Sequence, residues 1–253
     1  MKNIAAAFVF FTRLPFWRTK IFQVPAEYFN QVINYWAVVG WLTGGIMAGT
    51  LWLSAQILPY PVAVILCMLS RLIVTGALHE DGLADFLDGF GGGNNKERIL
   101  AIMKDSHIGT YGVVGLIFYF LLFYLSLSHL PLSVACIIAF IADSFCKLMS
   151  SQITRFLPYA RTAETSKSKT AYSKMSYKAL ITSCIFGVLP LVLIPDPMWL
   201  IAIVFPIVTF AGLIYLMKKK INGYTGDCCG ATFLLCELSF YLGIITLYGF
   251  FPL

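Results

Sequence analysis

The sequence predicts an all-α integral membrane protein, with about seven transmembrane helices and an N-terminal interfacial helix in a single polytopic domain (1–253). Apolar residues make up 59% of the 253 residues and charged residues 12%, against about 25% charged residues in an ordinary soluble domain. Apolar runs long enough to cross a bilayer recur along the chain, and Lys and Arg gather in alternate connections between them. This composition excludes a soluble enzyme, a disordered protein and a nucleic-acid-binding module.

Each expected span is an apolar run of roughly 17 to 25 residues, or close to that length. The spans are Val32–Ile57, Pro61–Leu78, Ile108–Ser128, Leu132–Met149, Ala179–Ile194, Trp199–Met217 and Cys229–Phe251. The fifth is the shortest and contains Pro190. Before the first span, the short apolar run Ile4–Phe11 predicts a helix that lies in the membrane interface, with its aromatic rings at headgroup level.

The distribution of basic residues orients these spans. If the N-terminus is cytoplasmic, the inner segments are 1–31, 79–107, 150–178 and 218–228. These segments, together with Lys147 at the inner end of the fourth span, hold every one of the 18 Lys and Arg residues except Arg71. Cytoplasmic connections are enriched in Lys and Arg. The pattern therefore predicts a multi-pass protein of the bacterial cytoplasmic (inner) membrane, with its N-terminus inside and an odd number of spans.

The main chemical signal is a cluster of carboxylates at residues 80–88, which hold four of the twelve Asp and Glu residues. On a helix, Asp81, Asp85 and Asp88 fall within an arc of about 60°. Like charges at this spacing repel each other, so a cation is expected to neutralise them. Mg²⁺ binds carboxylate oxygens and bridges to substrate phosphates. A solvated acidic face is the alternative interpretation.

Two further segments follow the cluster. The glycine tract Gly89–Gly93 is expected to form a turn, which either cradles phosphate oxygens or is simply flexible. Residues 103–112 then place Lys104, Asp105 and Ser106 at the inner mouth of the third span. Asp105 or Ser106 could cap that helix, belong to a site, or do both.

Acidic residues also occur late in the chain. Asp227 lies at the inner mouth of the last span, and Glu237 lies within that span. An acid inside a span is costly, so a functional role or a charged partner is expected. Arg71 is a candidate long-range partner for Glu237. Asp143 has a local candidate, because Lys147 lies one helical turn away.

The predicted orientation places the candidate carboxylates and several cations on one side of the membrane. The carboxylates are Asp81, Asp85, Asp88, Asp105 and Asp227, and the basic residues are Arg98, Lys104, Arg155 and Arg161. Carboxylates that hold a metal ion and cations that hold phosphate are typical of phosphoryl-type transfer. The sequence therefore predicts an active site at the cytoplasmic face.

Four motifs together resemble the signature of the cobalamin synthase (adenosylcobinamide-GDP ribazoletransferase) family. They are HEDGLADFLDGFGGG at 79–93, MKDSHIGTYG at 103–112, FFTRLP at 10–15 and GYTGDCCGAT at 223–232. Members of that family are membrane enzymes of the last steps of vitamin B12 assembly. They join adenosylcobinamide-GDP to α-ribazole or its 5′-phosphate, release GMP and require Mg²⁺.

The resemblance implies roles for specific residues. Asp81, Asp85 and Asp88 would bind the metal ion, with Asp227 and Asp105 as further candidates. The ribazole 3′-hydroxyl would attack the phosphorus attached to the corrinoid arm, and a cluster carboxylate or Asp105 would accept its proton. The expected phosphate-binding residues are Lys104, Ser106, Arg98, Arg155 and Arg161.

The expected partners are the two substrates and the lipid bilayer, with no nucleic acid, and the sequence leaves a homo-oligomer open. Two alternative functions also remain open at this point. A CDP-alcohol phosphotransferase likewise places aspartates on one helix face, but its usual pattern is not reproduced after residue 89. A secondary transporter would account for acids inside spans, although the main cluster lies at a membrane face.

Overall fold

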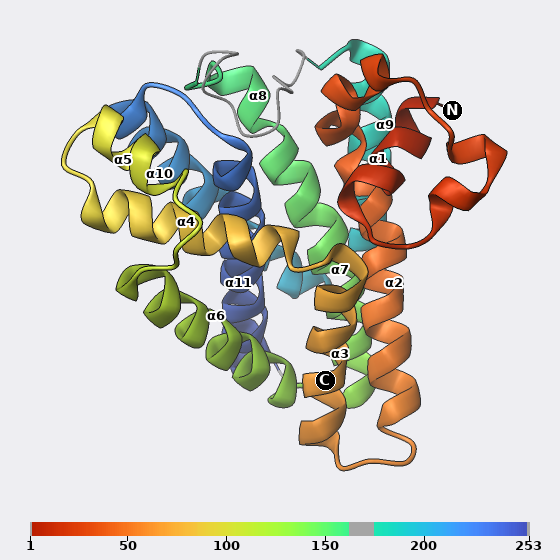
Figure 1. The fold of residues 1–253 in the computed structure, drawn as a ribbon. Helices are drawn as coiled ribbons and strands as arrows, with labels where there is room; N and C mark the ends of the chain where they lie inside the picture. The colour runs from red at the N-terminus through yellow and green to blue at the C-terminus, as the bar shows by residue number, and fades with distance from the viewer. Residues whose placement is uncertain (1, 162–174, 252–253) are drawn as a thin grey trace.

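The computed structural model describes residues 2–161 and 175–251, which are helical apart from their connections and one isolated β-bridge (Figure 1). The α-helices are α1 (Lys2–Phe11), α2 (Trp36–Ser54), α3 (Tyr60–Thr75), α4 (Leu78–Gly92), α5 (Lys96–Ile102), α6 (Thr110–Ser128), α7 (Leu132–Ser151), α8 (Ile153–Phe156), α9 (Tyr177–Val188), α10 (Val204–Ile221) and α11 (Gly226–Phe250). The 3-10 helices are η1 (Phe16–Arg18), η2 (Lys20–Phe22), η3 (Ala26–Tyr35), η4 (Leu189–Leu193) and η5 (Pro197–Ile203). Residues 162–174 of the inner segment expected at 150–178 lie outside the described residues.

The structure confirms a multi-pass helical membrane protein. Within the described residues, five helices are long and apolar enough to cross a bilayer, and α3 with α4 would make a sixth if the bent pair counts as one span. The fifth span expected from the sequence corresponds to α9 and η4, which together form a shorter apolar helix over Tyr177–Leu193. The count of seven spans and the orientation therefore stay predictions.

Two glycines allow α2 and α7 to pack closely. Gly40 and Gly44 are four residues apart, so they lie on one face of α2. A Cβ at Gly40 would lie 2.6 Å from Cα of Ser144, and one at Gly44 would lie 3.0 Å from the carbonyl oxygen of Phe140. This small-residue spacing is a recurrent way for membrane helices to approach each other closely.

Helix α11 is the centre of the bundle, and α6 and α10 lie at its periphery. In the most apolar part of α11, 78% of the residues are buried, against 28% in that of α6 and in that of the span Pro197–Ile221, which comprises η5 and α10. The exposed side chains of the peripheral helices are large and apolar, including Ile117, Phe118, Leu121, Val208 and Tyr215. Such a surface suits contact with lipid.

A sharp elbow separates α3 from α4. Helix α3 ends at Thr75, and both Gly76 (φ 65°) and Ala77 (φ 55°) adopt the left-handed conformation. Helix α4 then leaves at 91° to α3 and crosses the bundle in front of α11 (Figure 1). The backbone N–H of Arg13 donates to the carbonyl of Val74 at 2.7 Å, which ties the N-terminal segment to the elbow. The acidic segment therefore runs in a different direction from the helix that precedes it.

The glycine tract is not the turn that the sequence predicts. Gly89–Gly92 form the last turn of α4, which ends at Gly92. Their lack of side chains serves packing: a Cβ at Gly89 would lie 2.4 Å from Cγ of Met103, and one at Gly91 would lie 2.7 Å from the ring of Tyr111. The tract therefore gives the segments after α4 room to fold back against it.

Candidate active site

A pocket of about 130 Å³ lies where α4 and α11 begin. Its polar lining includes Asp81 from the first turn of α4, Asp227 from the first turn of α11, and Arg161. Aromatic residues of the N-terminal segment and of α2 line another side of the pocket. The complete remaining lining is Phe10, Phe11, Ile33, Trp36, Leu78, His79, Tyr159, Thr225, Gly226, Cys229 and Gly230. We call this the α4–α11 pocket.

Close glycine contacts bring the two helices together at this pocket. A Cβ at Gly82 would lie 3.1 Å from both Cα and the carbonyl oxygen of Asp227. A Cβ at Gly230 would lie 3.2 Å from the carbonyl oxygen of His79. Each helix thus packs its own glycine against the backbone of the other. This contact places Asp81 and Asp227, far apart in the sequence, on the same pocket.

A backbone clip brings Arg161 to the pocket. The N–H of Ala160 donates to the carbonyl of Tyr224 at 2.8 Å, and the N–H of Tyr224 donates to the carbonyl of Pro158 at 3.0 Å. One Nη of Arg161 donates to the carbonyl of Leu100 at 3.2 Å, which anchors the guanidinium. Burial raises the pKa of the Tyr224 phenol, so the hydroxyl group beside the clip stays neutral.

The pocket combines positive and negative potential. The N-terminal ends of α4 and α11 both face it, and helix N-termini favour anions such as phosphate. Thr225 caps α11 by accepting a hydrogen bond from the N–H of Cys228 at 3.3 Å. Arg161 adds a full positive charge, while Asp81 and Asp227 add negative charge. Such a site suits an anionic ligand that arrives with a cation.

The aromatic side of the pocket was not predicted from the sequence. The rings of Phe11 and Trp36 stack at 4.8 Å, and the Trp36 ring lies 5.1 Å from the ring of His79. His79 is 1% exposed, and its Nε2 has no hydrogen-bond partner in the described part of the chain. A signal was available, because Phe10, Phe11 and His79 all belong to the motifs at 10–15 and 79–93.

Asp88, at the other end of α4, holds the start of α6. Its two carboxylate oxygens accept hydrogen bonds from the N–H groups of Gly109 at 2.7 Å and Gly112 at 2.8 Å. A Cβ at Gly112 would lie 2.5 Å from the Asp88 carboxylate, so glycine is needed there. Asp88 therefore caps α6 from a neighbouring helix. Neither Asp105 nor Ser106 is the N-cap of α6: that residue is Gly109, and its N–H is held by Asp88.

A second, more open pocket of about 500 Å³ lies at this end of α4, lined by Asp88, Arg98 and Asp105 among others. The exposed Asp105 accepts a hydrogen bond from the N–H of His107 at 3.0 Å, and its carboxylate lies 2.7 Å from the ring Nδ1 of His107. We call this the α4–α6 pocket. It gathers a second subset of the predicted residues.

The predicted site residues therefore fall into three groups. Asp81, Asp227 and Arg161 line the α4–α11 pocket. Asp88, Arg98 and Asp105 line the α4–α6 pocket. The others line neither pocket: Asp85, which is half-buried on α4 between the two, and Lys104, Ser106 and Arg155, which are exposed.

The α4–α11 pocket fits Mg²⁺ only together with a substrate. Among the described residues, no three His, Cys, Asp or Glu side chains are grouped so that they could hold a metal ion. Mg²⁺ is usually bound through one or two carboxylates, with water and substrate phosphates completing an octahedron. Asp81 and Asp227 supply two such hard oxygen donors on one pocket, with room beside them.

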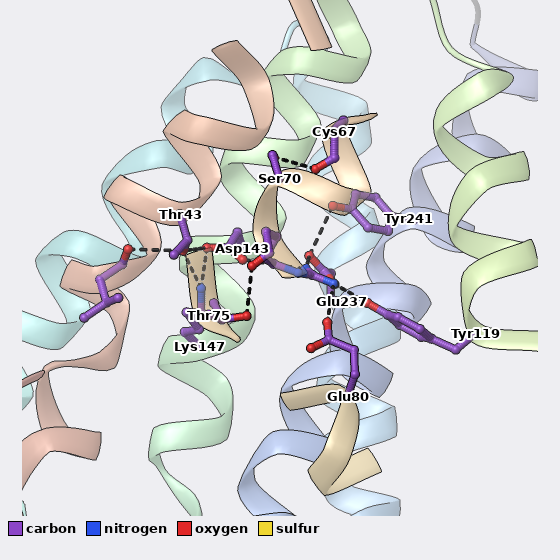
Figure 2. A network of polar contacts seen from close by, with 12 residues as sticks. Thr43, Cys67, Ser70, Thr75, Glu80, Tyr119, Asp143, Lys147, Glu237 and Tyr241 are labelled. Carbon is purple, nitrogen blue, oxygen red and sulfur yellow. Dashed lines mark hydrogen bonds and ion pairs between the residues drawn. The ribbon is translucent and has the colours of Figure 1, made fainter. Parts of the chain in front are cut away.

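A network of buried charges lies among the helices (Figure 2). Arg71 Nη1 donates to both carboxylate oxygens of Glu237, at 2.6 and 2.7 Å. Lys147 Nζ lies 2.5 Å from the carboxylate of Asp143 and donates to Thr43 Oγ1 at 2.6 Å. Both ion pairs expected from the sequence, Arg71 with Glu237 and Asp143 with Lys147, are confirmed.

The fold and the pocket define a multi-pass helical membrane protein with an acidic pocket built at two helix N-termini. The chain belongs to the Cobalamin-5-phosphate synthase family, whose sequence profile matches residues 3–245. An adenosylcobinamide-GDP ribazoletransferase of Shewanella oneidensis is 35% identical over 243 residues, covering 95% of this chain and 92% of the relative. The protein of the same name from Vibrio parahaemolyticus is 38% identical over 259 residues, covering 98% and 93%. No solved structure gave a significant match.

Proposed function

We propose that this protein is a transferase that joins adenosylcobinamide-GDP to α-ribazole, or to its 5′-phosphate, and releases GMP. The family match covers nearly the whole chain, and the relatives that carry this name align over almost their full length. One structural observation supports the location of the reaction: Asp81, Asp227 and Arg161 line one pocket at two helix N-termini. Neither the phosphotransferase nor the transporter alternative is favoured by these relatives.

In this proposal the pocket binds the pyrophosphate of the activated corrinoid. Asp81 and Asp227 would hold Mg²⁺. The bound ion would neutralise negative charge on the phosphates and on the leaving GMP. Arg161 and the positive N-terminal ends of α4 and α11 bind phosphate oxygens. The pocket is smaller than the roughly 300–1,000 Å³ of a typical small-molecule site, so it receives only the reacting part of the substrate.

The transfer is a substitution at phosphorus. The 3′-hydroxyl oxygen of the ribazole forms a bond to the phosphorus attached to the corrinoid arm. The bond from that phosphorus to the bridging oxygen breaks, and the electron pair leaves with GMP. A carboxylate of the cluster accepts the hydroxyl proton, and Asp85 is the candidate that we test, because it lies between the two pockets and one turn from Asp81 on the same face of α4. Asp88 is less suited, since both its oxygens already hold α6.

We also propose that the pocket faces the cytoplasm. The pocket lies beside the connection from α10 to α11, and α10 ends in a basic last turn, Lys218–Lys220. A run of lysines beyond a span favours the cytoplasmic side and its anionic lipids. A cytoplasmic site in a bacterial inner membrane would give direct access to soluble nucleotides and Mg²⁺.

The test is GMP release by the purified protein in detergent or liposomes. We expect release to require adenosylcobinamide-GDP, α-ribazole and Mg²⁺ together, to stop on chelation, and to return on adding Mg²⁺. Release without ribazole would indicate a hydrolase. Synthesis of lipid from CDP-diacylglycerol without GMP release would favour the phosphotransferase.

The variant Asp85→Asn tests the proton acceptor. It should keep substrate binding but lower the rate of GMP release, and near wild-type turnover would remove Asp85 from the mechanism.

A further inference from the structure

One guanidinium group connects the two helices that build the α4–α11 pocket. Arg71 lies in α3 and is 1% exposed. Its Nη1 contacts Glu237 of α11 at 2.6 Å, and its Nη2 contacts Glu80 of α4 at 3.4 Å. Arg71 therefore bonds directly to both helices of the pocket.

Tyrosine hydroxyls strengthen this connection. The Nη2 of Arg71 donates to the hydroxyl of Tyr119 in α6 at 2.5 Å, and that hydroxyl donates to Glu237 at 3.0 Å. The hydroxyl of Tyr241, one turn along α11, donates to the same carboxylate at 3.2 Å. Hydrogen bonds of this kind in a low-dielectric interior support each other and restrict the geometry of the group. Side chains of α4, α6 and α11 thus meet at Arg71 of α3, and Asp143 of α7 also lies 3.7 Å from its Nη1.

The acidic partners of Arg71 belong to the helices that carry the pocket carboxylates. Glu80 immediately precedes Asp81 in the first turn of α4. Glu237 lies in α11, the helix whose first turn contains Asp227. The elbow at Gly76 and Ala77 breaks the helix before α4, so side-chain contacts must fix the direction of α4. The Arg71–Glu80 pair, which joins α3 and α4 across the elbow, is such a contact.

We propose that Arg71 is a positioning residue, which holds α4 through Glu80 and α11 through Glu237 so that Asp81 and Asp227 face one pocket. The proposal rests on the proposed function for its effect on catalysis. Stability alone is a weak reason for a buried ion network, because apolar residues of similar shape often serve as well. Arg71 Nε and Glu80 Oε2 have no hydrogen-bond partner among the described residues, so the network is not fully satisfied. Orientation of the helices accounts for it better.

The decisive variant is Glu80→Gln, which keeps the size of the side chain and removes its charge. Hydrogen exchange followed by mass spectrometry should show faster exchange in the first turns of α4 and α11. Mn²⁺, used as a probe for the metal site, should bind about ten-fold more weakly, as is typical when a group that orients ligands is lost. The kcat for GMP release should fall together with the Mn²⁺ affinity. Arg71→Lys should give the same changes. Tyr119→Phe should give them at a smaller size, and it replaces Arg71→Lys if that variant fails to fold.

The matched control is Thr43→Val. Thr43 is equally buried and hydrogen-bonds to both Lys147 and Asp143 in the same network, but it contacts neither Arg71, α4 nor α11 through a hydrogen bond or ion pair. It should lower the unfolding temperature without changing exchange at the pocket or Mn²⁺ affinity. Unchanged exchange at α4 and α11 in Glu80→Gln would overturn the positioning role. If Glu80→Gln shows these exchange changes but the wild-type protein neither binds Mn²⁺ nor releases GMP, the positioning role stands and the proposed function is overturned.

Discussion

The two ends of α4 carry aspartates from one sequence motif in very different surroundings. At the first turn, Asp81 is exposed to a pocket that it shares with Asp227 and Arg161. At the last turn but one, Asp88 is 7% exposed, and both of its oxygens are engaged by backbone N–H groups of α6. The two carboxylates lie about 10 Å apart along the helix axis. One faces open space for a ligand, and the other holds a helix.

This contrast shows what helical spacing can and cannot indicate. Spacing places Asp81, Asp85 and Asp88 on one face of α4. The neighbouring helix then decides the role of each carboxylate, because α11 presents a second carboxylate to one end and α6 presents free N–H groups to the other. Groups with the same chemistry and helical face can therefore differ in function.

The largest expected effect is at the open end. Asp81→Asn should lower kcat roughly a thousand-fold, since loss of metal-assisted charge stabilisation costs several kcal/mol. The unfolding temperature should hardly change, because the side chain is exposed. GMP release and thermal unfolding of the same preparation measure both. Glu97→Gln, an exposed acid on α5, is the matched control, and comparable turnover of the two variants would contradict the assignment.

The next effect concerns the spacing of the helices that form the pocket. Gly82→Ala should lower kcat about ten- to hundred-fold, because small misplacement of reacting groups is costly. The added Cβ would lie 3.1 Å from the backbone of Asp227, so α4 and α11 must move apart. Gly45→Ala in α2 is the control, as its Cβ would meet nothing within 4 Å. Equal turnover in both variants would show that the close contact is dispensable.

A smaller effect compares the arginines of the two pockets. Arg161→Gln should raise the KM for the corrinoid substrate about ten-fold, the size expected for a lost charge-assisted hydrogen bond. Arg98→Gln, which changes a residue of the α4–α6 pocket, should raise this KM less. Steady-state kinetics with varied adenosylcobinamide-GDP decide between them. Equal increases would mean that the substrate contacts both pockets, which would restore Arg98 as a phosphate contact.

The smallest effect on catalysis is expected at the closed end of α4. Asp88→Asn should reduce stability by about 1–3 kcal/mol, because an amide group cannot accept both N–H bonds. The kcat of the folded protein should change little. Denaturant unfolding in detergent and turnover per folded molecule give the two quantities. A collapse of kcat like that of Asp81→Asn would instead place Asp88 in the metal site, as the sequence predicted.

Much of the bundle could be predicted from the sequence, because apolar length and charge distribution are local signals. The last span, expected at Cys229–Phe251, is α11 (Gly226–Phe250), and the fourth, expected at Leu132–Met149, is α7 (Leu132–Ser151). The pair Asp143–Lys147 followed from i,i+4 spacing. The pair of Arg71 with Glu237 followed from the cost of a lone charge inside a span.

Other features depend on contacts that spacing does not encode. Gly76 could indicate the elbow, but Ala77 gives no sign that it would adopt a left-handed conformation. The role of Asp88 depends on Gly109 and Gly112 of another segment. The glycine tract Gly89–Gly93 suggested a turn that could cradle phosphate, whereas Gly89 and Gly91 make room for Met103 and Tyr111. These are tertiary effects, and they decide which residues of a motif meet.

The Arg71–Glu237 pair also has a consequence for biosynthesis. Arg71 is translated and delivered to the bilayer long before Glu237, since α11 follows α3 to α10 in the chain. Until then the guanidinium lacks its closest acidic partner and has only the longer contacts to Glu80 at 3.4 Å and Asp143 at 3.7 Å, and a poorly compensated cation in lipid is expensive. Insertion of α11 is therefore the event that locks the assembly, and a chain truncated before α11 should be recognised by membrane proteases as unfinished.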